Sequence, residues 1–196
     1  RAVTMLLTLL KTRSQSLEVI TARWSDSDKE QVVEYYAEMS VQGKDLSAML
    51  EAALLYAECG VPIFPVWGVA HGRCRCGVAD CKNVGKHPLG ALVPHGVKDA
   101  TTEAGAIRRW WTRFPEANIG TPTIWASVID VDPRHGGDVA LAAAERAHGA
   151  LPDTSEVLTG GGGRHLYFAL VPGLTQSSSK VGSGIDVKSG AEGYVL

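Results

Sequence analysis

The chain has 196 residues, of which 45% are hydrophobic and 20% are charged, and its formal net charge at pH 7 is −2. These values indicate one ordinary globular domain, or one domain with an extension, long enough to bury a core without cross-links. They exclude a protein that is basic over its whole surface, so any contact with nucleic acid must come from local patches.

The amino-terminal residues give no membrane signal. The mostly apolar run from Val3 to Leu10 is far shorter than the ~20 residues that span a bilayer. Arg1 precedes this run as it would in a signal peptide, but Lys11 and Arg13 follow it without a small-x-small cleavage site. We therefore expect a cytoplasmic protein that does not contact a membrane.

Residues 1–47 are predicted to form a helical extension, with one helix that starts after Ser25–Ser27. A second helix is predicted from Asp45 to about Cys59, because apolar residues recur there at helical spacing. Gly60 suits the position after the end of that helix, since glycine readily takes the left-handed conformation found there.

The middle of the chain predicts one strand, one loop and one helix. Val61–Trp67 indicates a short strand, which its prolines confine to a sheet edge or a strand end. Residues 71–89 are rich in cysteine, glycine and polar residues and predict a loop. Thr102–Glu103 is the expected start of a helix that ends near Arg113.

The second half of the chain mixes predicted strands with one helix. Trp125–Asp132 predicts a strand, and the alanine-rich stretch Asp138–His148 predicts a helix. Four further short strands are predicted at Glu156–Thr159, Arg164–Leu170, Ile185–Lys188 and Gly193–Leu196. Because strands and helices do not alternate strictly, we predict an α+β fold rather than a doubly wound one.

Asp130 and Asp132 are the first candidate catalytic residues. They lie two positions apart in a predicted strand, so both side chains point to one face while Ile129 and Val131 face the core. Two carboxylates on one face offer an oxygen-rich site for Mg²⁺ or Mn²⁺, which can align a nucleophile and a leaving group. The alternative is an Asp-x-Asp that only starts the turn at Pro133.

Two downstream segments favour the catalytic interpretation. Four glycines precede a strand that carries Arg164 and His165, and Gly161, Gly162 and Gly163 suit a phosphate cradle. We predict that Arg164, His165 and Lys188 bind the nucleotide together with this loop. In the second segment Asp186 and Lys188 share one strand face, which suits a site for metal and triphosphate together. The alternatives are a flexible hairpin loop with a half-exposed histidine, and a surface edge strand with alternating charge.

The loop at residues 71–89 holds a second candidate metal site. Cys74, Cys76, Cys81 and His87 offer three thiolates and one imidazole, enough for a tetrahedral structural Zn²⁺ site. His71 is a substitute for His87, and the alternative is a set of free thiols on a mobile loop.

Three other groups of residues carry less weight. Cys59 at a helix end is expected to be a small buried residue. The helix near Arg113 carries two tryptophans that either stack on DNA or pack inward beside solvated arginines: Arg108, Arg109, Trp110 and Trp111. Three histidines are expected to be surface residues: His95, His135 and His148.

Several of these motifs occur together in an order that resembles one known family. The core of the match is Asp130-Val-Asp132, then Gly-Gly-Arg-His165, then Ile-Asp186-Val-Lys188. The flanking matches are Ala57–Pro65, Gly85–Pro88, Trp111, Asn118–Gly120, Asp132–Gly137 and Leu151–Thr154. The chain thereby resembles the bifunctional DNA primase/polymerase (prim-pol) N-terminal family of the archaeo-eukaryotic primase superfamily, over roughly residues 48–196.

The resemblance implies a fold, a reaction and roles for individual residues. It implies an α/β module packed on an antiparallel sheet like that of an RNA-recognition domain, with the site between them. Asp130, Asp132 and Asp186 would hold Mg²⁺ or Mn²⁺, and His165 would contact the nucleotide. DNA template, NTP or dNTP would be the partners, and a replicative helicase is a candidate partner because family members are frequently fused to one.

The chain departs from the family pattern at three places. Thr121–Ala126 replaces the usual glycine-bearing turn before the Asp-x-Asp strand, and Lys188 stands where an arginine is common. Family members usually continue beyond the segment that ends here at Leu196. We therefore expect residues 48–196 to be a catalytic domain that is truncated at its C-terminus, folded but poorly active.

Three functions compete at this point. The leading hypothesis is a DNA primase/polymerase that transfers a nucleotide to a 3′-hydroxyl in plasmid, phage or mobile-element replication. The others are a non-catalytic DNA-binding zinc module of a replication protein and a metal-dependent nuclease that uses the same acids. The glycine loop with His165 favours a triphosphate pocket over a nuclease.

Overall fold

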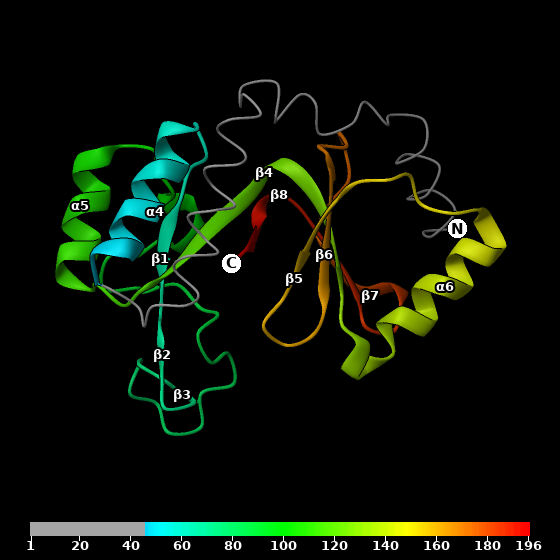
Figure 1. Ribbon diagram of the computed structural model, residues 1–196, viewed down its shortest axis with the longest axis horizontal. Helices are drawn as coiled ribbons and strands as arrows, with labels where there is room; N and C mark the ends of the chain where they lie inside the picture. Colours follow the sequence, from blue (N-terminus) through cyan, green and yellow to red (C-terminus); the bar gives the residue numbers. More distant parts are fainter. Residues whose placement is uncertain (1–45) are drawn as a thin grey trace. The chain divides into compact units, whose positions relative to one another are not determined.

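The computed structural model describes residues 46–196, which fold into two compact units (Figure 1). One unit contains residues 123–193, and the other contains residues 46–122 together with residues 194–196. The predicted helix after Ser25–Ser27 and the rest of the predicted extension up to residue 45 lie outside the described residues.

The unit of residues 46–122 is built around two helices that lie side by side, α4 and α5 (Figure 1). Its elements are α4 (Leu46–Glu58), β1 (Phe64–Val66), β2 (Val69–Ala70), β3 (Arg73–Cys74), the 3-10 helix η1 (Gly96–Asp99) and α5 (Ala104–Arg113). Trp111 is buried at the centre of the core, and its indole N–H donates to the Ala117 carbonyl at 3.0 Å. The predicted bounds of both helices are confirmed.

Helix α5 begins where the sequence predicts, at a capped N-terminus. The Glu103 carboxylate accepts hydrogen bonds from the backbone N–H groups of Gly105 and Ala106, at 2.7 and 2.5 Å. Trp111 is buried and Trp110 is half-buried, whereas Arg108 and Arg109 are exposed. The inward-packing interpretation of this helix therefore holds, and its tryptophans do not form an exposed stacking surface.

The unit of residues 123–193 contains most of an antiparallel sheet and one helix. Its elements are β4 (Asn118–Val131), the 3-10 helix η2 (Pro133–His135), α6 (Gly137–His148), β5 (Ser155–Leu158), β6 (Arg164–Ala169), β7 (Ser177–Gly182) and β8 (Ile185–Val195). The strand order is β5-β6-β4-β8-β7, and β1 pairs with the first residues of β4. Strand β4 begins in the unit of residues 46–122, and strand β8 ends in residues 194–196, which belong to the same unit.

The two faces of this sheet differ in chemistry. One face forms a hydrophobic core with Leu141 of α6, made of Ile129, Val131, Leu166, Phe168, Ile185 and Val187. Because successive residues of a strand point to opposite faces, the polar residues between them lie on the other face. The candidate residues Asp130, His165 and Asp186 therefore share that second face.

Two predicted strands are longer in the structure. β4 begins at Asn118 rather than at Trp125, because β1 pairs with its first residues and tolerates Pro65 at the sheet edge. β8 is one strand from Ile185 to Val195 rather than two. The glycine at position 193 permits this, since a Cβ there would lie 2.4 Å from the Thr123 hydroxyl oxygen.

Three further strands were not predicted from the sequence: β7, β2 and β3. β7 is a polar, largely exposed edge strand, so it lacks the alternation of apolar residues that marks a half-buried strand. The β2–β3 hairpin lies at the start of the predicted loop at residues 71–89, and two residues per strand are too few to give a periodic pattern.

The fold is a mixed α/β arrangement with a mostly antiparallel sheet and few helices, which agrees with the α+β expectation at that level. The finer description, an α/β module on an RNA-recognition-like sheet, stays a prediction. Within residues 46–196, no helix is long and apolar enough to cross a membrane.

Candidate active site and metal centre

A row of polar side chains crosses the sheet at the end of β4. We call it the polar row; its members are His165, Asp130, Asp132, Asp186 and Lys188. His165 of β6 lies opposite Asp130 of β4, and Ser178 of β7 lies opposite Asp186 of β8. Two contacts fix how β4 meets β8: Asp132 N–H donates to the Gly184 carbonyl at 2.8 Å, and the hydroxyl oxygens of Ser127 and Ser189 are 3.0 Å apart. Counting antiparallel from either contact places Asp130 opposite Asp186.

The first two members of the row are in electrostatic contact. His165 Nε2 lies 3.6 Å from Asp130 Oδ1, and the side chains of His165 and Asp130 are 13% and 31% exposed. The His165 ring also meets the edge of the Tyr167 ring, with the centroids 6.2 Å apart. The structure thus brings the predicted histidine and the first predicted carboxylate together.

Asp186 and Lys188 are also in contact, as their shared strand face predicts. Lys188 Nζ donates to Asp186 Oδ2 at 3.0 Å. The same carboxylate accepts from the Ser178 hydroxyl at 3.3 Å and from the Ser179 N–H at 3.1 Å. This acid therefore has a cation and two neutral donors around it.

Asp132 is held by the turn that follows it. The Arg134 guanidinium donates through Nε to Oδ1 at 3.0 Å and through Nη2 to Oδ2 at 2.9 Å. The Arg134 backbone N–H donates to Oδ1 at 2.9 Å, and His135 Nδ1 lies 2.9 Å from Oδ2. The hydrogen bonds from the Arg134 side chain, then those from His135 and the backbone, hold the pKa of this carboxyl well below its usual range, although partial burial opposes them.

The sequence did not single out Arg134 as a site residue and placed His135 on the surface. His135 is indeed exposed, but its ring nitrogen reaches the Asp132 carboxylate. A local signal exists, because an Asp followed by Pro-Arg-His caps a turn and meets residues two and three positions later. The orientation of the Asp132 carboxylate is therefore set by the 3-10 turn as well as by the strand.

The backbone of Asp132 is enclosed by two glycines. Its carbonyl accepts from the Gly137 N–H at 2.9 Å, and its N–H donates to Gly184. A Cβ at Gly137 would lie 2.5 Å from the Gly184 carbonyl oxygen and 2.8 Å from both the N and the O of Asp132. We call Asp132, Gly137 and Gly184 the glycine junction; it has no room for a side chain at position 137.

The glycine loop between β5 and β6 packs on the end of β4. Thr159 N–H donates to the Gly163 carbonyl at 2.8 Å, and Gly163 N–H donates to the Thr159 hydroxyl at 3.0 Å. A Cβ at Gly163 would lie 2.6 Å from the Val131 carbonyl oxygen, so the close approach requires glycine. A Cβ at Gly161 would lie 3.2–3.4 Å from the guanidinium of Arg134.

Arg164, predicted to bind the nucleotide, points to the face of β6 opposite His165. Its guanidinium donates to Asp138 at 3.2 Å and to Glu156 at 3.4 Å. The structure does not bring Arg164 to the polar row. The arginine that lies against the glycine loop is Arg134.

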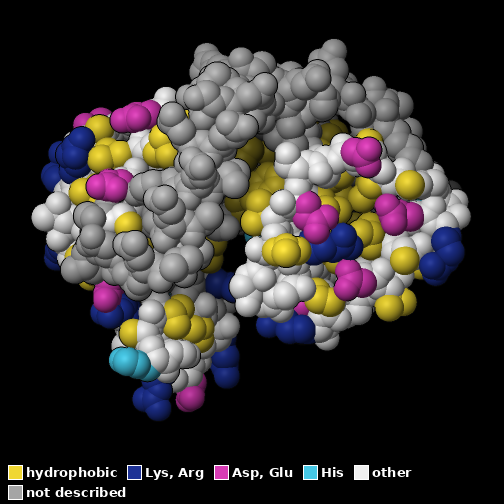
Figure 2. All heavy atoms as spheres, viewed as in Figure 1, with side chains coloured by type: hydrophobic (Ala, Val, Ile, Leu, Met, Phe, Trp, Pro, Cys, Tyr) yellow, Lys and Arg dark blue, Asp and Glu magenta, His cyan; other side chains and the backbone are white. Residues whose placement is uncertain are grey.

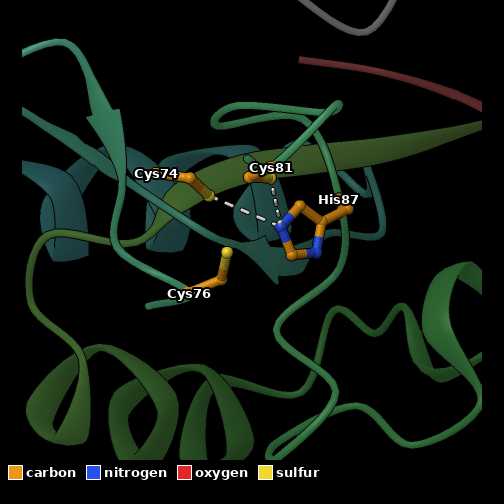
Figure 3. A group of neighbouring side chains, drawn as sticks. All are labelled: Cys74, Cys76, Cys81 and His87. Atoms are coloured by element: carbon orange, nitrogen blue, oxygen red, sulfur yellow. Dashed lines mark hydrogen bonds between the residues drawn. The ribbon is translucent and has the colours of Figure 1, made fainter. Parts of the chain in front are cut away.

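Cys74, Cys76, Cys81 and His87 converge as the sequence predicts (Figure 3). Their ligand atoms all lie within 4.8 Å of one another, and the Sγ atoms of Cys74 and Cys81 are 3.4 and 3.5 Å from His87 Nε2. A tetrahedral Zn²⁺ with Zn–S near 2.3 Å and Zn–N near 2.0 Å separates sulfur and nitrogen ligands by roughly 3.5 Å. Cys74 and Cys81 therefore already have the sulfur–nitrogen spacing to His87 that zinc requires, and Cys76 lies within 4.8 Å of the other ligand atoms.

The surrounding backbone fixes this Cys₃His group. Trp67 N–H donates to the His87 carbonyl at 3.0 Å, and the Asn118 side-chain amide donates to the carbonyls of Trp67 and Gly85 at 3.3 and 3.0 Å. His87 is thereby tied to the end of β1 and to β4. Of residues 46–196, these four are the only set of at least three Cys, His, Asp or Glu side chains with ligand atoms so closely gathered.

The electrostatic surroundings of the thiols differ. Burial alone would raise the pKa of Cys74, but hydrogen bonds from the Gly85 and Cys76 backbones, then from the Cys76 and His87 side chains, lower it to about 6. Burial is the main cause that raises the pKa of Cys81. A lowered pKa prepares Cys74 better than Cys81 to act as a thiolate ligand. His71 and Cys59 are not members of the group.

Comparison with known protein families places the chain in one family. A family profile described as bifunctional DNA primase/polymerase, N-terminal, matches residues 53–196. The chain belongs to this family. The matched region contains the Cys₃His group, the polar row and the glycine loop. Searches of the curated proteins and of the solved structures found no match for this chain.

Membership of the Prim-Pol family has consequences at the level of the family. The family has DNA primase/polymerase activity, which is of the nucleotidyltransferase type and depends on metal ions. Its substrates are DNA and nucleotides. The Cys₃His group fits metal binding and is compatible with zinc. Neither the family match nor the group assigns roles to individual acids.

Proposed function

We propose that this chain transfers a nucleotide from an NTP or dNTP to a 3′-hydroxyl on a DNA template, with the polar row as its catalytic centre. The observation that carries the proposal is the position of Asp130 opposite Asp186 on neighbouring strands. Facing like charges destabilise a sheet, and directly opposed side chains have Cβ atoms about 4.5–5.5 Å apart. A pair placed so close is better explained by a shared cation than by stability.

The donor set suits a hard divalent cation. Carboxylate oxygens are the preferred ligands of Mg²⁺ and Mn²⁺, and Asp130 and Asp186 are each only partly exposed. Asp132 is the third candidate ligand, on the same strand as Asp130. Cations held by these acids would supply electrostatic stabilisation of the phosphate that is being transferred and of the leaving pyrophosphate.

The protein residues of the row have complementary tasks. In the reaction the 3′-hydroxyl oxygen forms a bond to the α-phosphorus, and the bond from that phosphorus to the β-phosphate oxygen breaks. His165 and Lys188 are the side chains of the row that can meet phosphate oxygens, and Gly161–Gly163 offer close backbone approach. The geometry favours Arg134 rather than Arg164 at this loop.

The DNA-contacting surface that we propose includes the lobe that contains β2, β3 and the Cys₃His group. Residues 69–89 carry a single acid, Asp80, against four exposed cations: Arg73, Arg75, Lys82 and Lys86. Arg75 is paired with Glu116, which leaves Arg73, Lys82 and Lys86 to outnumber Asp80. Figure 2 shows Lys and Arg side chains spread over this part of the surface, beside hydrophobic ones. In a chain of net charge −2 this is a local basic patch of the kind that phosphate binding needs. We propose a structural Zn²⁺ in this lobe.

The same basic patch favours one alternative, a non-catalytic DNA-binding zinc module. The metal-dependent nuclease hypothesis has less support, because it does not explain the glycine loop. The replication context that we propose is that of a plasmid, phage or mobile element, with a replicative helicase as partner.

Primer extension with Mn²⁺ or Mg²⁺ separates these functions. We expect template-dependent incorporation by the parent and by Asp153→Ala, which removes an exposed acid outside the row. Asp130→Asn and Asp186→Asn should each lose incorporation at least 100-fold. Asp130→Asn should keep the thermal midpoint, since it relieves a like-charge contact. Undiminished incorporation by the double variant would refute the proposal. DNA shortening by the parent would favour the nuclease, and DNA binding without either reaction would favour the zinc module.

A further inference from the structure

We propose that Arg134 binds the triphosphate of the nucleotide. Before a divalent cation binds, the Arg134 guanidinium is paired with Asp132 instead. This inference rests on the proposed function and adds a residue and an order of events to it. It begins from two contacts of one side chain. The Arg134 guanidinium is paired through two nitrogens with Asp132, and it lies against Gly161 of the glycine loop.

The position of Arg134 is suited to phosphate binding. A guanidinium presents a planar fork of N–H donors that matches phosphate oxygens in pairs. Its side chain is 60% exposed, so one edge is paired with Asp132 and much of the rest is open. Gly161 has no side chain to separate the loop backbone from the guanidinium, and a Cβ there would come within 3.2 Å of it. A phosphate in the loop would therefore lie within reach of Arg134.

Asp132 cannot serve Arg134 and a divalent cation in the same way at once. Both of its carboxylate oxygens are hydrogen-bonded to Arg134, at 3.0 and 2.9 Å, and Oδ2 also meets His135 at 2.9 Å. A cation that takes an Asp132 oxygen repels the guanidinium and competes with it for one of its two acceptors. The guanidinium then needs a new anionic partner, and the triphosphate in the adjoining loop is the one that the reaction brings.

Arg164 provides the contrast. It is 34% exposed and is paired with Asp138 and Glu156 on the other face of β6, so divalent cations at the polar row would not release it. Of the two arginines next to the glycine loop in sequence or in space, only Arg134 shares its acid with the candidate metal site. This is why we assign the triphosphate contact to Arg134.

The alternative is that Arg134 only stabilises the turn after β4. The two roles predict different changes in the Mn²⁺ affinity when Arg134 is replaced. If Arg134 competes with the cation, Arg134→Ala should bind Mn²⁺ more tightly than the parent when no nucleotide is present, measured as free Mn²⁺ by electron paramagnetic resonance. We expect a gain of about 3- to 10-fold, because Asp132 loses a competing cation.

The same variant should bind nucleotide more weakly. With Mn²⁺ saturating, we expect the affinity for a non-hydrolysable nucleoside triphosphate to fall about 10- to 100-fold, the usual effect of losing hydrogen bonds to a charged group. Arg134→Lys keeps the charge but not the fork and should lose less. Arg146→Ala, an exposed arginine of α6, is the matched control and should change neither affinity.

These measurements decide the inference separately from the proposed function. Arg134→Gln is a second variant that keeps polar contacts to the turn, and it should repeat both shifts if Arg134→Ala folds poorly. Unchanged nucleotide affinity, or Mn²⁺ affinity that does not rise, in both variants overturns the role of Arg134. If Asp130→Asn still abolishes incorporation in that case, the proposed function stands and only this inference falls.

Discussion

The glycine junction gives a sharp test of how the fold positions Asp132. Gly137→Ala adds one methyl group at a point where three backbone atoms lie 2.5–2.8 Å from its carbon, so the chain must shift. Backbone cannot swing away as the end of a flexible side chain can. Two hydrogen bonds depend on the contact: Asp132 N–H to Gly184 at 2.8 Å and Gly137 N–H to Asp132 at 2.9 Å.

The magnitude follows from these contacts. Weakening two backbone hydrogen bonds costs about 1–3 kcal/mol, and forcing a methyl into filled space costs a further ~1–3 kcal/mol. Alanine's advantage over glycine in a helix returns at most ~1 kcal/mol, since Gly137 is the first residue of α6. We therefore expect Gly137→Ala to lower the free energy of unfolding by about 2–4 kcal/mol.

Urea denaturation followed by circular dichroism measures this loss. With a slope of about 2 kcal/mol per molar urea, the midpoint should fall by ~1–2 M. Gly160→Ala is the matched control, because a Cβ there meets nothing within 4 Å. Equal midpoints for the two variants would refute the reasoning. If the fold survives, primer extension should still drop, because a displacement of ~1 Å at a reacting group costs about 100-fold.

Three further predictions concern the core, the metal and acid sensitivity. Trp111→Ala should lower the free energy of unfolding by about 3–5 kcal/mol in urea titration, because it empties the core and orphans the Ala117 carbonyl; a loss below ~1 kcal/mol would contradict this. Purified protein should hold one Zn²⁺ per chain by elemental analysis, and His87→Ala should hold clearly less; equal zinc in both would remove the site. The depressed pKa of Asp132 stabilises the fold fully above pH ~4, and this contribution declines as pH falls. Asp132→Asn should therefore unfold at lower urea than the parent at pH 7, and the difference should shrink toward pH 2; a constant difference would contradict the linkage.

The parts of the site that lie on regular strands could be predicted from the sequence. Alternation along β4 and β8 places Asp130, Asp186 and Lys188 on one face, and the structure has them there. The four ligands of the Cys₃His group were likewise found from residue type and clustering. In both cases a local rule decides: the period of a strand in one, and the chemistry of the ligands in the other.

The parts that depend on turns and tertiary contacts could not be predicted from strand periodicity. Nothing in strand periodicity says that Asp132 turns to Arg134, because that direction is set by the 3-10 turn and by packing at Gly184. The same periodicity places Arg164 away from His165, although a motif that joins the two residues suggests a common task. Adjacent residues in a motif can thus serve opposite faces of a sheet.

The charges of the polar row and of the neighbouring Arg134 suggest why metal and nucleotide should bind together. Asp130, Asp132 and Asp186 carry three negative charges, and Arg134 and Lys188 carry two positive ones, so these five side chains together carry −1. Two divalent cations alone would raise the sum to +3, with both protein cations still in place. A triphosphate of about four negative charges returns it to −1 and gives Arg134 and Lys188 new partners. Because the three acids and Lys188 are only partly exposed, an unbalanced charge costs more there than in water, so the row favours the joint arrival of cations and nucleotide over either one alone.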